Sequence, residues 1–103
     1  KILGDKTILF MANHGVTTVG NTVAEAYDRL YYIERVAQVQ LFAMWTGQRL
    51  KQLPTNIVDR TARVNGQDKG DETKFPKYDP PPAVRHFAAL KRILDRKEPD
   101  YAT

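Results

Sequence analysis

The stretch T-I-L-F-M-A-N-H-G-V-T-T-V-G, from Thr7 to Gly20, determines how the rest of the chain is arranged. Residues 7–12 are almost continuously apolar and rich in β-forming side chains, which is typical of a strand buried on both faces. Residues 16–19 predict a second strand. Because only three residues, one of them a glycine, separate the two runs, the sequence predicts a hairpin over residues 7–20 with His14 at its tip.

The position of His14 permits two interpretations. An imidazole at the end of a rigid element is well placed for chemistry, because the element fixes its position. A single histidine in a turn is also commonly a residue that only hydrogen-bonds within the turn. The residues of the hairpin alone leave both open.

Length and composition predict a folded domain. The chain has 103 residues, of which 42% are hydrophobic and 27% charged, and this length predicts one domain with a single core. No apolar run approaches the roughly 18 residues of a membrane span, and the N-terminus lacks the pattern of a secretory signal, so we expect neither insertion nor export. The absence of cysteine excludes disulfides and thiolate metal sites, and it favours a cytoplasmic location.

The basic residues do not indicate a nucleic-acid site. The formal net charge is +4, but twelve of the sixteen Lys and Arg residues are spread from Arg49 to Lys97 with acidic residues among them. A nucleic-acid footprint would be a contiguous basic stripe. We therefore expect solvated helix faces and no nucleic-acid partner.

The start of the chain resembles the end of a helix. Gly4 follows three residues typical of a last helical turn, and glycine readily adopts the left-handed conformation that ends helices. The body of such a helix is not in the sequence, and the first residue is not Met. We therefore expect the chain to be the C-terminal part of a longer protein.

A long helix is predicted over residues 22–46. Thr22 and Glu25 form the Thr-x-x-Glu pattern in which each side chain binds a free backbone amide at the start of a helix. Apolar residues then recur at three- and four-residue steps until Gly47 ends the run. Such a helix is about 36 Å long, enough to lie across a whole sheet.

The second half of this helix differs from the first. Up to Arg35 the sequence has an ordinary charged face, but between residues 36 and 45 only Gln38 and Gln40 are polar. A segment that is apolar all round requires cover on more than one side, from the C-terminal tail or from a second subunit. The helix also carries aromatic residues at helical spacing, which we interpret as core or subunit interface and not as a ligand-stacking box. These are Tyr27, Tyr31, Tyr32, Phe42 and Trp45.

The remaining sequence predicts two further helices. A short helix over residues 54–65 begins at Pro54, which suits the first helical position. Residues 66–82 have no periodicity and are expected to form an irregular excursion or an arm that reaches another subunit. A C-terminal helix follows over residues 82–96, and His86 lies at the flank of its apolar stripe, as expected of a partly exposed surface histidine.

The residue inventory excludes several mechanisms. The chain has no serine, no cysteine and only two histidines, so it supplies neither a serine nucleophile nor a three-histidine metal site. It also lacks the glycine-rich phosphate loops. By itself the chain is catalytically incomplete, and no acid, base or nucleophile is assigned.

Residues 8–41 carry a resemblance to a known family. The sequence I-L-F-M-A-N-H-G-V-T-T-V-G-N-T-V-A-E-A-Y-D-R-L-Y-Y-I-E-R-V-A-Q-V-Q-L resembles the C-terminal signature of the class II aldolase/adducin family. In that family a strand ends in Asn-His-Gly, and a long helix follows that opens with Thr-x-x-Glu-Ala and contains a Glu-x-x-x-x-x-Gln stretch. Glu34 and Gln40 have that last spacing. The tail from His86 onward is similar to the ends of bacterial members.

The resemblance implies a fold and a metal site. The implied fold is α/β, a three-layer class II aldolase-like domain in which helices flank a mixed or antiparallel sheet, and residues 1–103 would be its C-terminal portion. Family enzymes bind a divalent metal, usually Zn²⁺, through a His-x-His pair upstream and the His of Asn-His-Gly. That assigns one metal ligand to His14, and neutral imidazole on a rigid tip suits zinc. The other ligands, the acid/base residue and the phosphate loops belong to segments outside this sequence.

The function implied is that of a metal-dependent lyase. Such an enzyme would cleave a carbon–carbon bond in a small hydroxylated carbonyl substrate, phosphorylated or not. Family enzymes are commonly homotetramers with active sites between subunits. The alternative is a noncatalytic, adducin-like interaction module in which His14 is only a turn residue, although the presence of Asn-His-Gly favours the enzyme.

Overall fold

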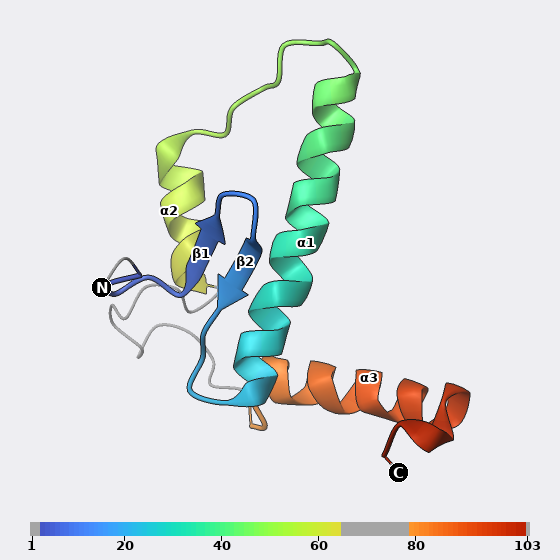
Figure 1. Ribbon diagram of the computed structural model, residues 1–103. Coiled ribbons are helices and arrows are strands. Elements are labelled where there is room, and N and C mark those ends of the chain that lie inside the picture. The colour runs from blue at the N-terminus through green and yellow to red at the C-terminus, as the bar shows by residue number, and fades with distance from the viewer. Residues whose placement is uncertain (1–2, 65–78, 103) are drawn as a thin grey trace.

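The computed structural model describes residues 3–64 and 79–102 of the chain and shows a two-stranded sheet followed by three α-helices (Figure 1). The strands are β1 (Ile8–Met11) and β2 (Gly15–Thr18), and the helices are α1 (Val23–Trp45), α2 (Thr55–Val64) and α3 (Pro82–Lys97). A 3₁₀ turn, η2 (Pro99–Ala102), follows α3. Most of the irregular segment predicted over residues 66–82 lies outside the described residues. The elements that are described are those of an α/β fragment.

β1 and β2 form the predicted hairpin. The strands are antiparallel and pair Ile8 with Thr18 and Phe10 with Val16, so these side chains share one face of the hairpin. In the turn after β1, the backbone amide of His14 donates to the carbonyl of Met11 at 3.1 Å. One hairpin of four-residue strands is marginal in water by itself, so it depends on what packs against it.

The connection from β2 to α1 is tightly fixed. Thr22 caps α1 by accepting from the amide of Glu25 at 3.2 Å, while Glu25 accepts at 2.8 Å from the amide of Asn21, one residue earlier than the cap amide expected from the sequence. The Thr18 hydroxyl donates to the carbonyl of Ala26 at 2.8 Å. These bonds hold the start of α1 against β2.

Gly20 allows this close approach. A Cβ atom at this position would lie 2.7 Å from the amide nitrogen of Ala26 and 2.7 Å from Cβ of Glu25, closer than real contacts permit. The side chain of Arg29 also reaches back across the junction and donates to the carbonyl of Val19. Only a residue without a side chain fits where the chain turns from the sheet into the helix.

α3 packs across the first half of α1, and aromatic rings make the contact (Figure 1). Tyr27 meets Phe87 edge to face with ring centroids 5.5 Å apart, and Tyr31 meets His86 in the same manner at 4.5 Å. The guanidinium of Arg35 lies 4.1 Å from the centroid of the Tyr31 ring. Such pairs contribute about 0.5–1.5 kcal/mol each beyond the area that they bury.

The expectation of a single buried core is wrong for the described residues, none of which is buried. The chain exposes 9461 Å², whereas a compact monomer of 11.8 kDa exposes about 5,900 Å². Its radius of gyration is 16.7 Å, against about 13 Å for a compact domain of this length. The elements predicted from local sequence form, but they do not enclose an interior.

The expectation that residues 7–12 are buried on both faces is also wrong. Phe10 is 65% exposed and Met11 37%, while Ile8 and Leu9 are only partly covered. The physical reason is that, within the described residues, the sheet has only two strands, and α1 is the helix that packs against it. A continuous apolar strand requires a layer on each face, and here one layer is partial and the other is missing.

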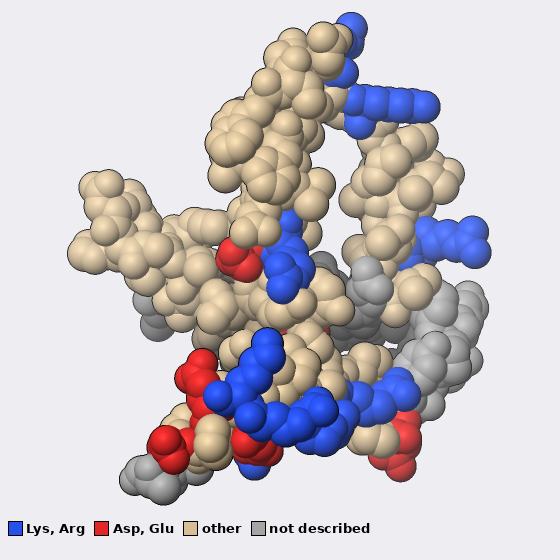
Figure 2. Space-filling view, turned by 90° about the vertical axis from the view of Figure 1, so that its right-hand side faces the viewer, with Lys and Arg blue, Asp and Glu red and all other residues tan. Residues whose placement is uncertain are grey.

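The C-terminal helix does not cover residues 36–45. The C-terminal tail is one of the two sources of cover that the sequence predicts for this segment. α3 instead contacts the first half of α1, since its ring contacts involve Tyr27, Tyr31 and Tyr32. In the second half, Phe42 is 58% exposed and Trp45 76%. Figure 2 shows this upper part of the molecule as a column almost without charged side chains.

Candidate functional site

His14 lies at the tip of the hairpin, where the sequence analysis places it. The turn residues Ala12, Asn13 and His14 join the two strands, and all three are exposed. Asn13 adopts φ 62° and Gly15 adopts φ 110°, values in a region that Asn tolerates and Gly adopts freely. The sequence Asn-His-Gly therefore suits a tight turn that projects an imidazole from a rigid element.

The ring of His14 is available as a ligand, but it is one ligand only. In residues 3–64 and 79–102 no side chain hydrogen-bonds to this ring, and no group of three or more His, Cys, Asp or Glu residues comes together. A zinc site needs three or four such donors. The donor chemistry of His14 fits a divalent metal, and further ligands would have to come from outside the described residues.

The two histidines of the chain occupy different parts of the structure. α3, which carries His86, lies beyond the open end of the hairpin, away from the tip (Figure 1). His86 Nδ1 is 2.6 Å from Oδ1 of Asp28, and the two side chains are 22% and 25% exposed. A neutral His86 in this arrangement donates its Nδ1 proton to the carboxylate. We assign the pair a structural role, as a polar clamp between α1 and α3.

The sequence predicts a surface histidine at position 86 but does not predict its partner. The two residues are 58 positions apart, so no spacing rule connects them. The only local signal is that Asp28, Tyr31 and Tyr32 lie at helical spacing on the side of α1 that receives α3.

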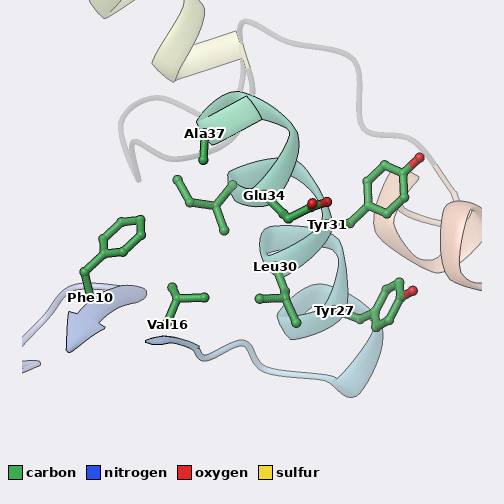
Figure 3. Close-up of a pocket in the computed structure, with 8 residues that line it drawn as sticks. Phe10, Val16, Tyr27, Leu30, Tyr31, Glu34 and Ala37 are labelled. Atoms are coloured by element: carbon green, nitrogen blue, oxygen red, sulfur yellow. The ribbon is translucent and has the colours of Figure 1, made fainter. Parts of the chain in front are cut away.

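An apolar hollow of about 460 Å³ lies between the hairpin and α1. Figure 3 shows Phe10 and Val16 projecting from the hairpin toward Leu30 and Ala37 of α1. Among its lining residues only Glu34 is charged, and it binds Gln38 at 3.1 Å. Small-molecule sites usually combine an apolar wall with several convergent polar groups. This hollow lacks them and has the character of a packing surface without its partner.

The sequence of the described site matches a known family. The profile of the Class II Aldolase and Adducin N-terminal domain matches residues 1–41, which include the hairpin, His14 and most of α1. No solved structure matches the chain. Within the described residues, no helix has both the length and the apolar character to cross a membrane.

Two curated relatives resemble nearly the whole chain. A protein of Pseudomonas aeruginosa that carries the provisional name of an aldolase class 2 protein is 28% identical over 105 residues, which cover 96% of this chain and 36% of that protein. A protein of Caulobacter vibrioides with the same provisional name is 28% identical over 101 residues, which cover 97% of this chain and 35% of that protein. The chain therefore spans about a third of the length of these relatives.

The hairpin with its exposed imidazole and the helices that follow it are compatible with an α/β fragment. The match of residues 1–41 and the two relatives together support the class II aldolase/adducin family for this chain. Members of this family typically use a divalent metal, which makes His14 the residue of this chain to test as a ligand.

Proposed function

We propose that this chain is part of a metal-dependent, class II aldolase-like lyase that cleaves a carbon–carbon bond in a small hydroxylated carbonyl compound, phosphorylated or not. The observation that carries the proposal is the exposed ring of His14, without a hydrogen-bond partner among the described residues, on a tight hairpin turn inside the segment that matches the family.

In this proposal His14 holds one coordination position of a zinc ion or another divalent metal. Gly15 allows the turn that presents the ring, and pairing between β1 and β2 keeps the turn in place. When bound, the metal supplies Lewis-acid stabilisation of the negative charge that develops on substrate oxygens as the bond breaks. The remaining ligands and the acid/base residue would come from segments outside the described residues.

The wider features of the proposal follow from the family. We propose a three-layer domain in which β1 and β2 form part of a larger sheet, an assembly of four copies with sites between subunits, and a cytoplasmic location. The exposed apolar faces of the hairpin and of α1 support the first two, because both faces need cover that the described residues do not provide.

A noncatalytic, adducin-like interaction module is the second candidate. The observation that favours it is that the described residues gather no set of three metal-ligating side chains, while they expose much apolar surface. In that case His14 would be a turn residue, and the apolar faces would serve protein contacts alone.

Anomalous X-ray scattering at the zinc edge separates the two candidates. The protein should be isolated from its source, crystallised with zinc, and compared with a His14→Asn variant. The enzyme proposal expects a peak about 2.0–2.1 Å from a ring nitrogen of His14 and its loss in the variant. A His86→Asn variant is the matched control and should keep the peak. Zinc bound elsewhere, or none bound, would overturn the assignment of His14 and favour the interaction module.

A further inference from the structure

The turn that carries His14 restricts the residue before it. Because the amide of His14 donates to the carbonyl of Met11 at 3.1 Å, residues 11–14 form a β-turn in which Asn13 is the third residue. Asn13 has a φ of 62°, and a positive φ at this position of a turn favours glycine or asparagine. Of these two residue types, only asparagine adds a functional group.

The turn does not use the side-chain amide of Asn13. Asparagine side chains in turns often bond a neighbouring backbone group. Within the part of the chain that the structure describes, the Asn13 side chain bonds neither such a group nor the ring of His14. Asn13 is also exposed. It therefore offers an acceptor oxygen and an NH₂ donor at the tip of the hairpin.

Asn13 is the polar neighbour of His14 in the turn. The Cα atoms of consecutive residues are about 3.8 Å apart, and the pairing of β1 with β2 holds both residues at the same end of the hairpin. The remaining turn residue, Ala12, has no polar side chain. A ligand held at the ring of His14 would therefore find the amide of Asn13 as the polar side chain that the turn supplies beside it.

We propose that Asn13 binds substrate at the site of His14, an inference that rests on the proposed function. The Asn13 NH₂ group donates a hydrogen bond to the substrate oxygen on which negative charge develops as the carbon–carbon bond breaks. The amide stays neutral and transfers no proton, so Asn13 stabilises that charge without acting as an acid or a base. Removal of one such donor typically lowers turnover by about 10²–10³-fold.

The alternative is that asparagine serves the backbone alone. Glycine adopts a positive φ more readily than asparagine, so in that case glycine would serve equally well at position 13. Asn13→Gly separates the two explanations, because it keeps the turn and removes the amide. Asn13→Asp is a second variant that also tolerates this backbone conformation, and it replaces the donor with a carboxylate.

Binding of acetohydroxamate tests the proposal. This small compound binds zinc through two oxygens and carries negative charge on them when bound. The variants are made in the complete gene, and calorimetry measures the dissociation constant of acetohydroxamate for each zinc-loaded protein. Asn13→Gly and Asn13→Asp should each weaken binding by about tenfold or more, because a hydrogen bond to a charged oxygen is worth that much.

Asn21→Gly is the matched control. Asn21 is an exposed asparagine between β2 and α1, beyond the open end of the hairpin, and its backbone amide donates to Glu25. Loss of its side chain keeps that bond, so Asn21→Gly should bind acetohydroxamate as the wild type does. An equal loss of affinity in Asn21→Gly and Asn13→Gly would overturn the proposal.

Zinc content separates the failure of this inference from that of the proposed function. Asn13→Gly should bind as much zinc per chain as the wild type and should show the same helix content by circular dichroism. Equal acetohydroxamate affinity in Asn13→Gly and the wild type, with zinc bound at His14, would overturn the role of Asn13 alone. Loss of zinc from Asn13→Gly would also overturn it, because Asn13 would then serve the metal site. A wild type without zinc at His14 would overturn the proposed function and this inference together.

Discussion

The two halves of α1 have apolar side chains at the same helical spacing, yet the halves differ in what packs against them. In residues 23–35 the side chains meet β2 and α3, with Thr18, Phe87 and His86 in direct contact. In residues 36–45 every apolar side chain except Ala43 is exposed. Periodicity thus shows that a helix needs cover, but it does not show which segment provides it.

The difference also separates two kinds of contact. The first half is held by specific bonds and ring contacts between residues that are near each other in the fold, so it should behave as a unit with the hairpin and α3. The second half exposes apolar surface, which stabilises the protein only where a partner removes it from water.

The largest effect is expected where β2 passes into α1. Gly20→Val should destabilise the chain by about 3 kcal/mol, because its side chain would overlap the backbone of Ala26. Urea unfolding followed by circular dichroism measures this. Gly47→Asn is the control, since Gly47 has a positive φ of 67° and open space around it, and Asn tolerates that conformation. Equal losses in the two variants would show that the junction is not tightly packed.

A smaller effect is expected from the clamp between α1 and α3. Asp28→Ala should cost about 1–2 kcal/mol, because it leaves a partly buried His86 without its carboxylate. A double-mutant cycle with His86→Ala isolates the coupling between the two side chains. Additive losses would contradict a direct interaction and would leave the ring contacts as the only link between the helices.

The N-terminal cap of α1 should contribute about 1 kcal/mol. Thr22→Ala removes the hydroxyl that accepts from the Glu25 amide, and thermal unfolding should show the loss. Thr46→Ala is the matched control at the other end of the helix, where the hydroxyl donates to the carbonyl of Ala43. Because the side chains of residues 36–45 are mostly exposed among the described residues, fraying of that end should change stability less. A larger loss of stability in Thr46→Ala than in Thr22→Ala would show that the second half of α1 is the more firmly held.

Local sequence predicts the elements of this fold well, and the reason is that short-range signals specify them. The Thr22 and Glu25 pattern marks the start of α1, and Asn13 to Gly15 supply a turn with the left-handed conformations that a tight hairpin requires. The predicted ranges 22–46, 54–65 and 82–96 coincide closely with α1, α2 and α3. Such signals depend on neighbours in the chain and need no tertiary structure.

Long-range features are not predictable in the same way. Which half of α1 receives α3 depends on Asp28 and His86, which no spacing connects, and the close approach at Gly20 appears only when the helix is placed against the strand. For the candidate site, the sequence predicts the tip position of His14 from the turn alone. Its role as a ligand comes from the family resemblance and stays a prediction, because the described residues gather no group of three metal-ligating side chains.

The smallest effect within a single chain is expected in the second half of α1, and its size should depend on protein concentration. Phe42 is 58% exposed, so Phe42→Ala should change the free energy of unfolding by less than about 0.5 kcal/mol when the protein is dilute. If a second copy covers this surface, the loss should grow with concentration, since association stabilises the folded state by mass action. Phe87→Ala is the matched control, because Phe87 meets Tyr27 within the chain and does not line the apolar hollow, and its cost should be the same at every concentration. A large loss for Phe42→Ala in dilute protein would show that the chain covers residues 36–45 by itself, and the contrast between the two halves would then disappear.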